Sequence, residues 1–79
     1  MKKSDNTNTN PINPNKLPLS KWTAVTPQNR EKHFLVTDIV KDENDSIMFC
    51  KLEAVLNRKE YLIKWQELKN NARWKPGWH

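Results

Sequence analysis

Four tryptophans, Trp22, Trp65, Trp74 and Trp78, fall in a chain of only 79 residues, and this density constrains the fold more than any other feature. A short domain has little interior, and each indole ring can bury roughly 150–250 Å² of surface. At about 25 cal/mol per Å², one buried ring contributes up to about 4–6 kcal/mol of gross stabilisation. We therefore expect the tryptophans mainly to build the core, with Trp65 as its surest member.

The first nineteen residues differ in composition from the remainder of the chain. Residues 1–19 contain five Asn and three of the five Pro, and their only aliphatic side chains beyond Met1 are Ile12, Leu17 and Leu19. Such a segment buries too little apolar surface to offset the entropy lost on ordering it. The sequence therefore predicts a disordered, flexible Asn/Pro-rich tail over 1–19 and one small Trp-rich domain over 20–79.

Three features bear on the compartment. The longest apolar run is residues 47–50, which is too short to span a bilayer. No apolar segment follows Lys2 and Lys3, so the N-terminus does not resemble an export signal. Cys50 is the only cysteine, and a lone thiol without an export signal favours a reducing environment. We therefore expect a soluble cytoplasmic protein without a membrane span.

Alternation of apolar and polar residues predicts three strands. Residues 33–41 are rich in β-branched and aromatic types, and residues 47–56 and 59–65 place apolar side chains at every second position. Asp and Asn in the intervening segments 42–46 and 57–59 suit tight turns, because these residue types tolerate a left-handed backbone. The sequence therefore predicts a mainly β fold containing a three-stranded antiparallel meander.

The second hairpin has a register in which every apolar residue of one face meets an apolar partner. This register follows if Asn57 and Arg58 form a two-residue loop. Its one flaw places Lys51 opposite Lys64. The predicted cross-strand neighbours on the apolar face are Ala54 with Tyr61, Leu52 with Ile63 and Cys50 with Trp65, and Met48 and Leu56 extend this face.

Helical alternatives compete at three places. Residues 52–69 also fit a 3.6-residue period, although Lys59 and Gln66 interrupt the apolar stripe. Thr26-Pro27 is typical of a helix start and predicts a short helix within 27–32, and residues 66–70 suit one helical turn. Our preferred architecture is a small SH3-like half-open barrel, in which the Trp22 segment and residues 66–78 cover the sheet.

The residues needed for catalysis or metal binding are not grouped in the sequence. His33 opens a predicted strand, His79 is the last residue, and neither is placed near Cys50, which lies on the apolar face as an inert thiol. One cysteine and two distant histidines do not suit a metal site, and no glycine-rich phosphate loop is present. We therefore expect a protein that is not an enzyme and uses no cofactor.

Basic and aromatic residues alternate near the C-terminus, in a half of the chain with excess positive charge. Residues 46–79 carry seven basic and three acidic side chains, for a net charge of +4. Pro76 and Gly77 favour a bend that would bring the indoles of Trp74 and Trp78 together. The candidate residues for binding nucleic acid or another partner are Arg73, Trp74, Lys75, Trp78, Lys64 and Lys69, with a second cluster at Trp22, Arg30 and Lys32.

The combined pattern resembles a family of short bacterial Trp-rich proteins found in cyanobacteria and marine proteobacteria. The resemblance implies a small single domain over about residues 21–78, and it implies no established activity. The residues that carry it are Lys21-Trp22-Thr23-Ala24-Val25, Arg30-Glu31-Lys32-His33-Phe34, Cys50-Lys51-Leu52-Glu53-Ala54-Val55-Leu56, Trp65-Gln66-Glu67-Leu68, Trp74 and Gly77-Trp78.

Three functions remain open from the sequence. The first is a non-catalytic module that binds RNA or single-stranded DNA, with Lys64, Lys69, Arg73 and Lys75 on phosphates and the indoles on bases. The second is a protein–protein adaptor or small accessory subunit that uses the same patch on an acidic protein surface. The third is an enzyme or redox protein that uses Cys50, and it requires a reactive thiol.

Overall fold

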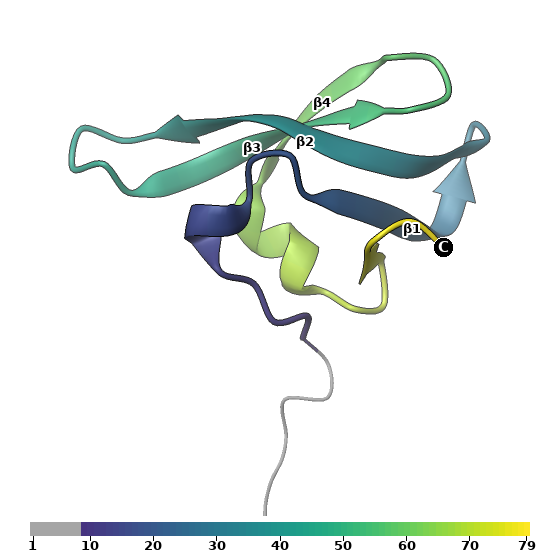
Figure 1. Ribbon diagram of the computed structural model, residues 1–79, viewed down its shortest axis with the longest axis horizontal. Coiled ribbons are helices and arrows are strands. Elements are labelled where there is room, and N and C mark those ends of the chain that lie inside the picture. The colour runs from purple at the N-terminus through teal and green to yellow at the C-terminus, as the bar shows by residue number, and fades with distance from the viewer. Residues whose placement is uncertain (1–8) are drawn as a thin grey trace, which may run out of the picture.

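The computed structural model describes residues 9–79, which form one open sheet of five antiparallel strands with two 3-10 turns (Figure 1). The turns η2 (Pro14–Lys16) and η3 (Trp65–Lys69) lie on the same side of the sheet. The strand order is β4-β3-β2-β1-β5, so β4 and β5 are the two edges. The strands are β1 (Lys21–Gln28), β2 (Glu31–Lys41), β3 (Ile47–Ala54), β4 (Glu60–Lys64) and β5 (Trp74–Pro76).

The predicted mainly β, antiparallel architecture is confirmed, but the number of strands is corrected. The three predicted strands correspond to β2, β3 and β4, and the alternative of one helix over 52–69 is wrong. Two further strands, β1 and β5, pair with each other along the other half of the sheet. The result is an open five-stranded sheet in place of the predicted three-stranded meander in an SH3-like barrel.

The segment predicted as a short helix within 27–32 is instead the hairpin that joins β1 to β2. Asn29 and Arg30 form its two-residue loop with φ of 55° and 66°, and Gln28 lies opposite Glu31. Positive φ at both central residues matches the right-handed twist of the strands. Pro27 lies near the end of β1, in the stretch where the β1–β2 register shifts, so it starts no helix.

The β3–β4 hairpin keeps the predicted faces but changes its partners. Leu52 lies opposite Tyr61 and Cys50 opposite Ile63, which is a shift of two residues from the predicted register. The shift arises because β3 ends at Ala54, so the connection is longer than the two-residue loop expected from the sequence. A shift of two preserves the face of every side chain, and it removes the predicted contact of Lys51 with Lys64.

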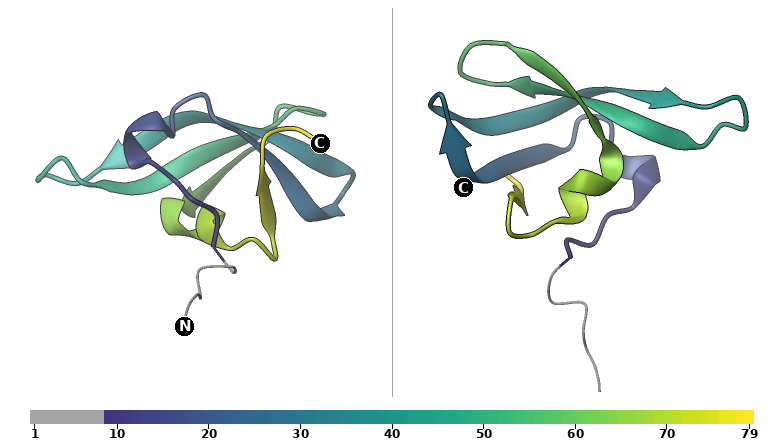
Figure 2. Two further views of the ribbon diagram at one scale, coloured as in Figure 1. Left: turned by 60° about the horizontal axis from the view of Figure 1, so that its bottom comes forward. Right: turned by 180° about the vertical axis from the view of Figure 1, so that it is seen from behind.

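The core lies on the face of the sheet that η2 and η3 cover, and we call this the inner face (Figure 2). Trp22 is the most buried of the four indoles at 4% exposed, whereas Trp65 is half-buried and packs against the core from η3. Met48 and Leu56, predicted on the apolar face, are exposed because they lie beyond its covered centre. The buried apolar residues are Leu17, Trp22, Phe34, Val36, Cys50, Leu52, Ala54 and Leu68.

The segment before β1 packs against the inner face. Leu17 is 1% exposed, and the buried Asn10 donates its side-chain N–H groups to the carbonyl oxygens of Leu68 and Trp74 at 2.7 and 2.9 Å. Leu19 is exposed, has a φ of 66° and donates its backbone N–H to Val36. Residues 9–19 of the predicted tail therefore pack against the rest of the fold, and residues 1–8 lie outside the described residues.

Within residues 9–79, no helix combines the length and the apolar character needed to cross a membrane. The two 3-10 turns span three and five residues.

Leu17 and Leu19 form a matched pair for testing whether this segment stabilises the fold. Leu17→Ala should lower the free energy of unfolding by about 2–5 kcal/mol, because it leaves a cavity in the core. Leu19→Ala should change it by less than about 0.5 kcal/mol, because this side chain is exposed. Urea denaturation followed by tryptophan fluorescence measures both, and a Leu17→Ala effect below about 0.5 kcal/mol would show that the Leu17 contact does not stabilise the fold.

Candidate functional site

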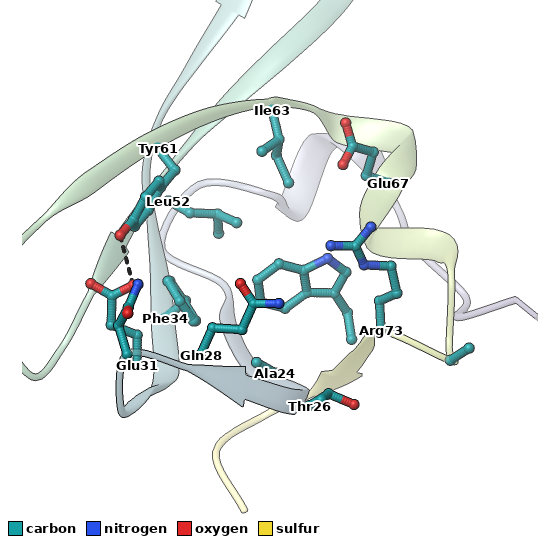
Figure 3. Close-up of a pocket in the computed structure, with 13 residues that line it drawn as sticks. Ala24, Thr26, Gln28, Glu31, Phe34, Leu52, Tyr61, Ile63, Glu67 and Arg73 are labelled. Carbon is teal, nitrogen blue, oxygen red and sulfur yellow. Dashed lines mark hydrogen bonds between the residues drawn. The ribbon is translucent and has the colours of Figure 1, made fainter.

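A pocket of about 410 Å³ opens on the inner face between β4, η3 and the β1–β2 hairpin (Figure 3). Every strand of the sheet contributes to its wall. The lining residues are Ala24, Thr26, Gln28, Asn29, Glu31, Phe34, Leu52, Tyr61, Ile63, Glu67, Ala72, Arg73 and Trp74.

Aromatic and aliphatic side chains from neighbouring strands form one wall of the pocket. Phe34 contacts the Trp74 ring edge-on, with ring centroids 5.2 Å apart, and the Tyr61 ring at 6.2 Å. Leu52 and Ile63 lie beside these rings (Figure 3). The side chains share one face because residues two apart in a strand point the same way and Leu52 lies opposite Tyr61. This wall suits the burial of an apolar group.

A hydrogen-bonded carboxylate lies beside the Tyr61 and Phe34 rings (Figure 3). Glu31 is buried and accepts hydrogen bonds from the Tyr61 hydroxyl at 2.6 Å and from the Asn57 side-chain N–H at 2.8 Å. The bond from Tyr61 and then the bond from Asn57 lower the pKa of Glu31, with a smaller effect of Lys59. The same bond raises the pKa of Tyr61. The pair connects β4 to the β1–β2 hairpin and so holds the two sides of the pocket together.

Polar side chains at the mouth include one cation. The side chains of Gln28, Glu67 and Arg73 surround the opening (Figure 3). Among the residues that the structure describes, the Arg73 guanidinium has neither a hydrogen bond nor an ion pair within 4.0 Å, and the Trp74 indole N–H has no acceptor. The mouth therefore offers donors that a ligand could use, although the nearby Glu67 opposes an anion.

The predicted C-terminal binding patch is divided between the two faces of the sheet. Trp74 lies opposite Ala24 on the inner face and enters the pocket. Trp78 lies on the outer face, where its N–H donates to the Phe34 carbonyl at 2.9 Å and the Lys21 ammonium lies 4.9 Å from its ring centroid. It is 43% exposed. The bend at Gly77 therefore separates the two indoles. The ring of Trp22 is buried in the core, so it is not accessible to a binding partner.

The predicted basic residues are dispersed. Lys75 lies opposite Thr23 on the outer face, and Lys64 ends β4. The Lys69 ammonium lies 5.0 Å from the ring centroid of Trp65, on η3. Arg30 and Lys32 are exposed at the β1–β2 hairpin. Of the nine predicted residues, the structure brings only Arg73 and Trp74 into the pocket.

Several pocket residues were missed by reasoning from the sequence. Tyr61 and Glu31 are 30 residues apart, and nothing local to either one indicates the pairing. Thr26 and Gln28 were predicted at the start of a short helix, although they belong to β1. Alternation in the predicted hairpin did place Leu52, Tyr61 and Ile63 on one face, which is the signal for this part of the pocket wall.

Cys50 lies in the core, away from the surface. Its side chain is fully buried, and this burial, with a smaller effect of the Glu67 charge, raises the pKa of the thiol to about 11. Within residues 9–79, no group of three or more His, Cys, Asp or Glu side chains is placed to hold a metal ion. The described site can therefore bind a group by burial and hydrogen bonding, and it presents no thiolate nucleophile at neutral pH.

Comparison with known proteins identifies one family. The family model described as Tryptophan-rich protein (DUF2389) matches residues 20–79. No curated protein and no solved structure matches the chain. The matched residues include every strand and the whole pocket lining.

The Glu31–Tyr61 bond predicts a pH-dependent contribution to stability. Because the pKa of folded Glu31 lies below its ordinary value of 4.5, this contribution is present above pH 4.5 and is lost as the pH falls through the lowered value. Glu31→Gln should therefore lower stability at pH 7 and flatten the stability curve below pH 4.5. Urea denaturation from pH 2.5 to 7 measures this, and Tyr61→Phe should shift the curve in the same direction. Parallel curves for wild type and Glu31→Gln would contradict the role of the bond.

The burial of Cys50 predicts a slow thiol reaction. At pH 8 the folded protein should react with a disulfide reagent at least about a hundredfold more slowly than the unfolded chain, because both access and thiolate fraction are low. Labelling with and without urea measures the ratio. Equal rates would instead favour the reactive-thiol function considered from the sequence.

Proposed function

The chain belongs to the Tryptophan-rich protein (DUF2389) family, and we propose that it is a non-catalytic binding module that docks on a protein partner. The observation that carries the proposal is the open pocket on the inner face, whose wall is aromatic and aliphatic and whose mouth is polar. Pockets that combine an apolar wall with a few polar groups are common binding sites, and the anchor side chains of protein partners also fill well-packed pockets. The buried thiol of Cys50 suits a reducing cytoplasm, which we propose as the location.

An apolar side chain of the partner enters the pocket in this proposal. Tyr61, Ile63 and Trp74 form the accessible surface that it contacts, and the buried Phe34 and Leu52 lie beneath them. Removing about 100 Å² of apolar surface from water contributes roughly 2.5 kcal/mol, which makes one such anchor a large part of a weak interaction. The volume of about 410 Å³ leaves room for the neighbouring backbone of the partner as well.

Charge favours an acidic partner segment. The chain has a formal net charge of +5, which attracts acidic surfaces over long range and raises the rate of association. At the mouth, Arg73 can pair with a carboxylate beside the apolar anchor. Glu67 and Glu31 line the same pocket, so the local preference is weaker than the net charge alone indicates. The proposed partner segment therefore combines a bulky apolar residue with acidic neighbours.

A single-stranded nucleic acid is the second candidate, and the outer face supplies the observation for it. Trp78 is partly exposed there, and Lys21 and Lys75 lie on the same face. Two contacts reduce the ring surface available for stacking, since Lys21 covers the Trp78 ring and His33 lies 6.1 Å from it. We therefore rank nucleic-acid binding below protein binding.

Neighbouring positions on β1 provide a test with a matched control. Thr26 lines the pocket, whereas the exposed Val25 does not. Peptides selected from a random phage-displayed library should carry acidic residues around a bulky apolar residue. Thr26→Tyr should weaken the selected peptide at least about tenfold, or ~1.4 kcal/mol, by filling the mouth, and Val25→Tyr should leave its affinity unchanged. Isothermal titration calorimetry measures both.

A mixed-sequence RNA pool separates the two candidates. If the pool binds tightly at low salt while no peptide is selected, the protein-docking proposal is wrong and the outer-face site is favoured. Equal effects of Thr26→Tyr and Val25→Tyr on peptide affinity would also overturn it, because the pocket would then not be the site.

A further inference from the structure

Strand β4 leaves one side of its backbone open. It is the outermost strand of the sheet, and its only strand partner among the described residues is β3. Ala54 donates its N–H to the Lys59 carbonyl, and hydrogen-bonded pairs alternate along an antiparallel ladder. Tyr61 and Ile63 therefore direct their backbone groups toward β3, and Glu60, Leu62 and Lys64 direct theirs toward the open edge.

The sequence of this edge is complementary to itself. β4 reads Glu60-Tyr61-Leu62-Ile63-Lys64, with opposite charges at its two ends and a leucine at its centre. An antiparallel pairing centred on Leu62 places Glu60 opposite Lys64 of a second copy and Lys64 opposite Glu60. In this register Glu60, Leu62 and Lys64, whose backbone groups face the open edge, form the hydrogen-bonded pairs across the axis. The pairing of opposite charges and the alternation of hydrogen-bonded pairs therefore both favour the antiparallel alignment centred on Leu62.

The side chains of the edge suit the same arrangement on both faces. On the outer face Leu62 is 57% exposed and would meet its own symmetry mate. On the inner face Tyr61 would lie opposite Ile63 of the second copy, which extends the apolar wall of the pocket. The Glu60 carboxylate is 3.9 Å from the Lys51 ammonium within the chain, and a lysine of the second copy would add to this ion pair.

The opposite edge offers no equivalent pairing. Strand β5 has three residues, Trp74–Pro76, and Pro76 has no N–H to donate. Of the two edges, only β4 is long enough for a symmetric ladder with a charged pair at each end.

We propose that two copies of the chain associate through their β4 strands, with the two-fold axis at Leu62. The two five-stranded sheets then form one continuous sheet, and the unpaired edge disappears. The two pockets lie side by side across the axis, because Tyr61 and Ile63 belong to both the pocket wall and the inner face of the joined strands. The association is independent of the proposed docking function, since the pocket is complete within one chain.

Charge exchange between the two ends of β4 tests the proposal on the full chain. Sedimentation equilibrium from about 10 μM to 1 mM should show a monomer–dimer equilibrium for the wild type. Lys64→Glu places Glu opposite Glu and should raise the dissociation constant at least about tenfold. The double variant Glu60→Lys/Lys64→Glu restores opposite charges and should recover most of the affinity. An equimolar mixture of Lys64→Glu with Glu60→Lys should form the heterodimer preferentially.

A backbone substitution provides a second readout. Leu62→Pro removes an N–H that faces the open edge and not β3, so the monomer should keep its circular dichroism while dimerisation is lost. Leu62→Thr keeps the N–H and should still dimerise more tightly than Leu62→Pro. A wild-type protein that is monomeric up to about 1 mM would overturn the proposal, and so would a double charge exchange that does not restore association.

Discussion

The burial of Phe34, the cross-strand partner of Trp22, is the constraint on which the other parts of the structure depend. These residues are direct neighbours across β1 and β2, and both are buried on the inner face. Trp74 of β5 packs edge-on against Phe34, and Tyr61 of β4 contacts the same ring. Both edge strands therefore contact the ring of Phe34. In a domain covered by two 3-10 turns instead of long helices, the Trp22 and Phe34 rings complete a core that is otherwise built mainly of aliphatic side chains.

The pocket and the open edge both follow from a sheet that curls without closing. The β1–β2 register shifts between Thr23 and Gln28, and the β2–β3 register shifts between Val36 and Asp38, and such irregularities bend a sheet. The bending brings β4 toward β5, and η3 crosses the remaining gap. Because β4 and β5 do not pair, the apolar wall between them stays accessible and β4 keeps its unpaired edge. A closed barrel of the same strands would have neither feature.

The sequence predicted the parts of the fold that depend on local alternation. The strands β2, β3 and β4 could be found in this way. The loss of alternation after Trp65 indicated the helical turn predicted at 66–70, which the structure places at Trp65–Lys69. The strand β1 was not predicted because Thr26-Pro27 is typical of a helix start. The strand β5 was not predicted because it is too short to show alternation. The burial of Leu17 and the hydrogen bonds of Asn10 could not be predicted from the composition of residues 1–19, because their partners lie far along the chain.

The candidate site was harder to predict than the fold, for a physical reason. A cluster in sequence such as Arg73 to Trp78 becomes a cluster in space only if the backbone keeps the side chains on one face. Here the indoles of Trp74 and Trp78 lie on opposite faces of the sheet. The pocket instead joins Glu31 to Tyr61 through a long-range hydrogen bond. Which residues gather depends on the β1–β5 pairing, and that pairing is not visible in the composition of either segment.

The left-handed backbone at Leu19 and Arg58 has a consequence for how the protein could adapt to heat. Both residues carry a side chain at a φ of 66°, a conformation that costs roughly 1–2 kcal/mol for a residue with a Cβ atom. Both side chains are exposed, so their replacement would remove little packing. Relieving the positive φ at these two loop residues would therefore raise the free energy of unfolding. Selection for growth at higher temperature would find its first gains there, before any repacking of the interior.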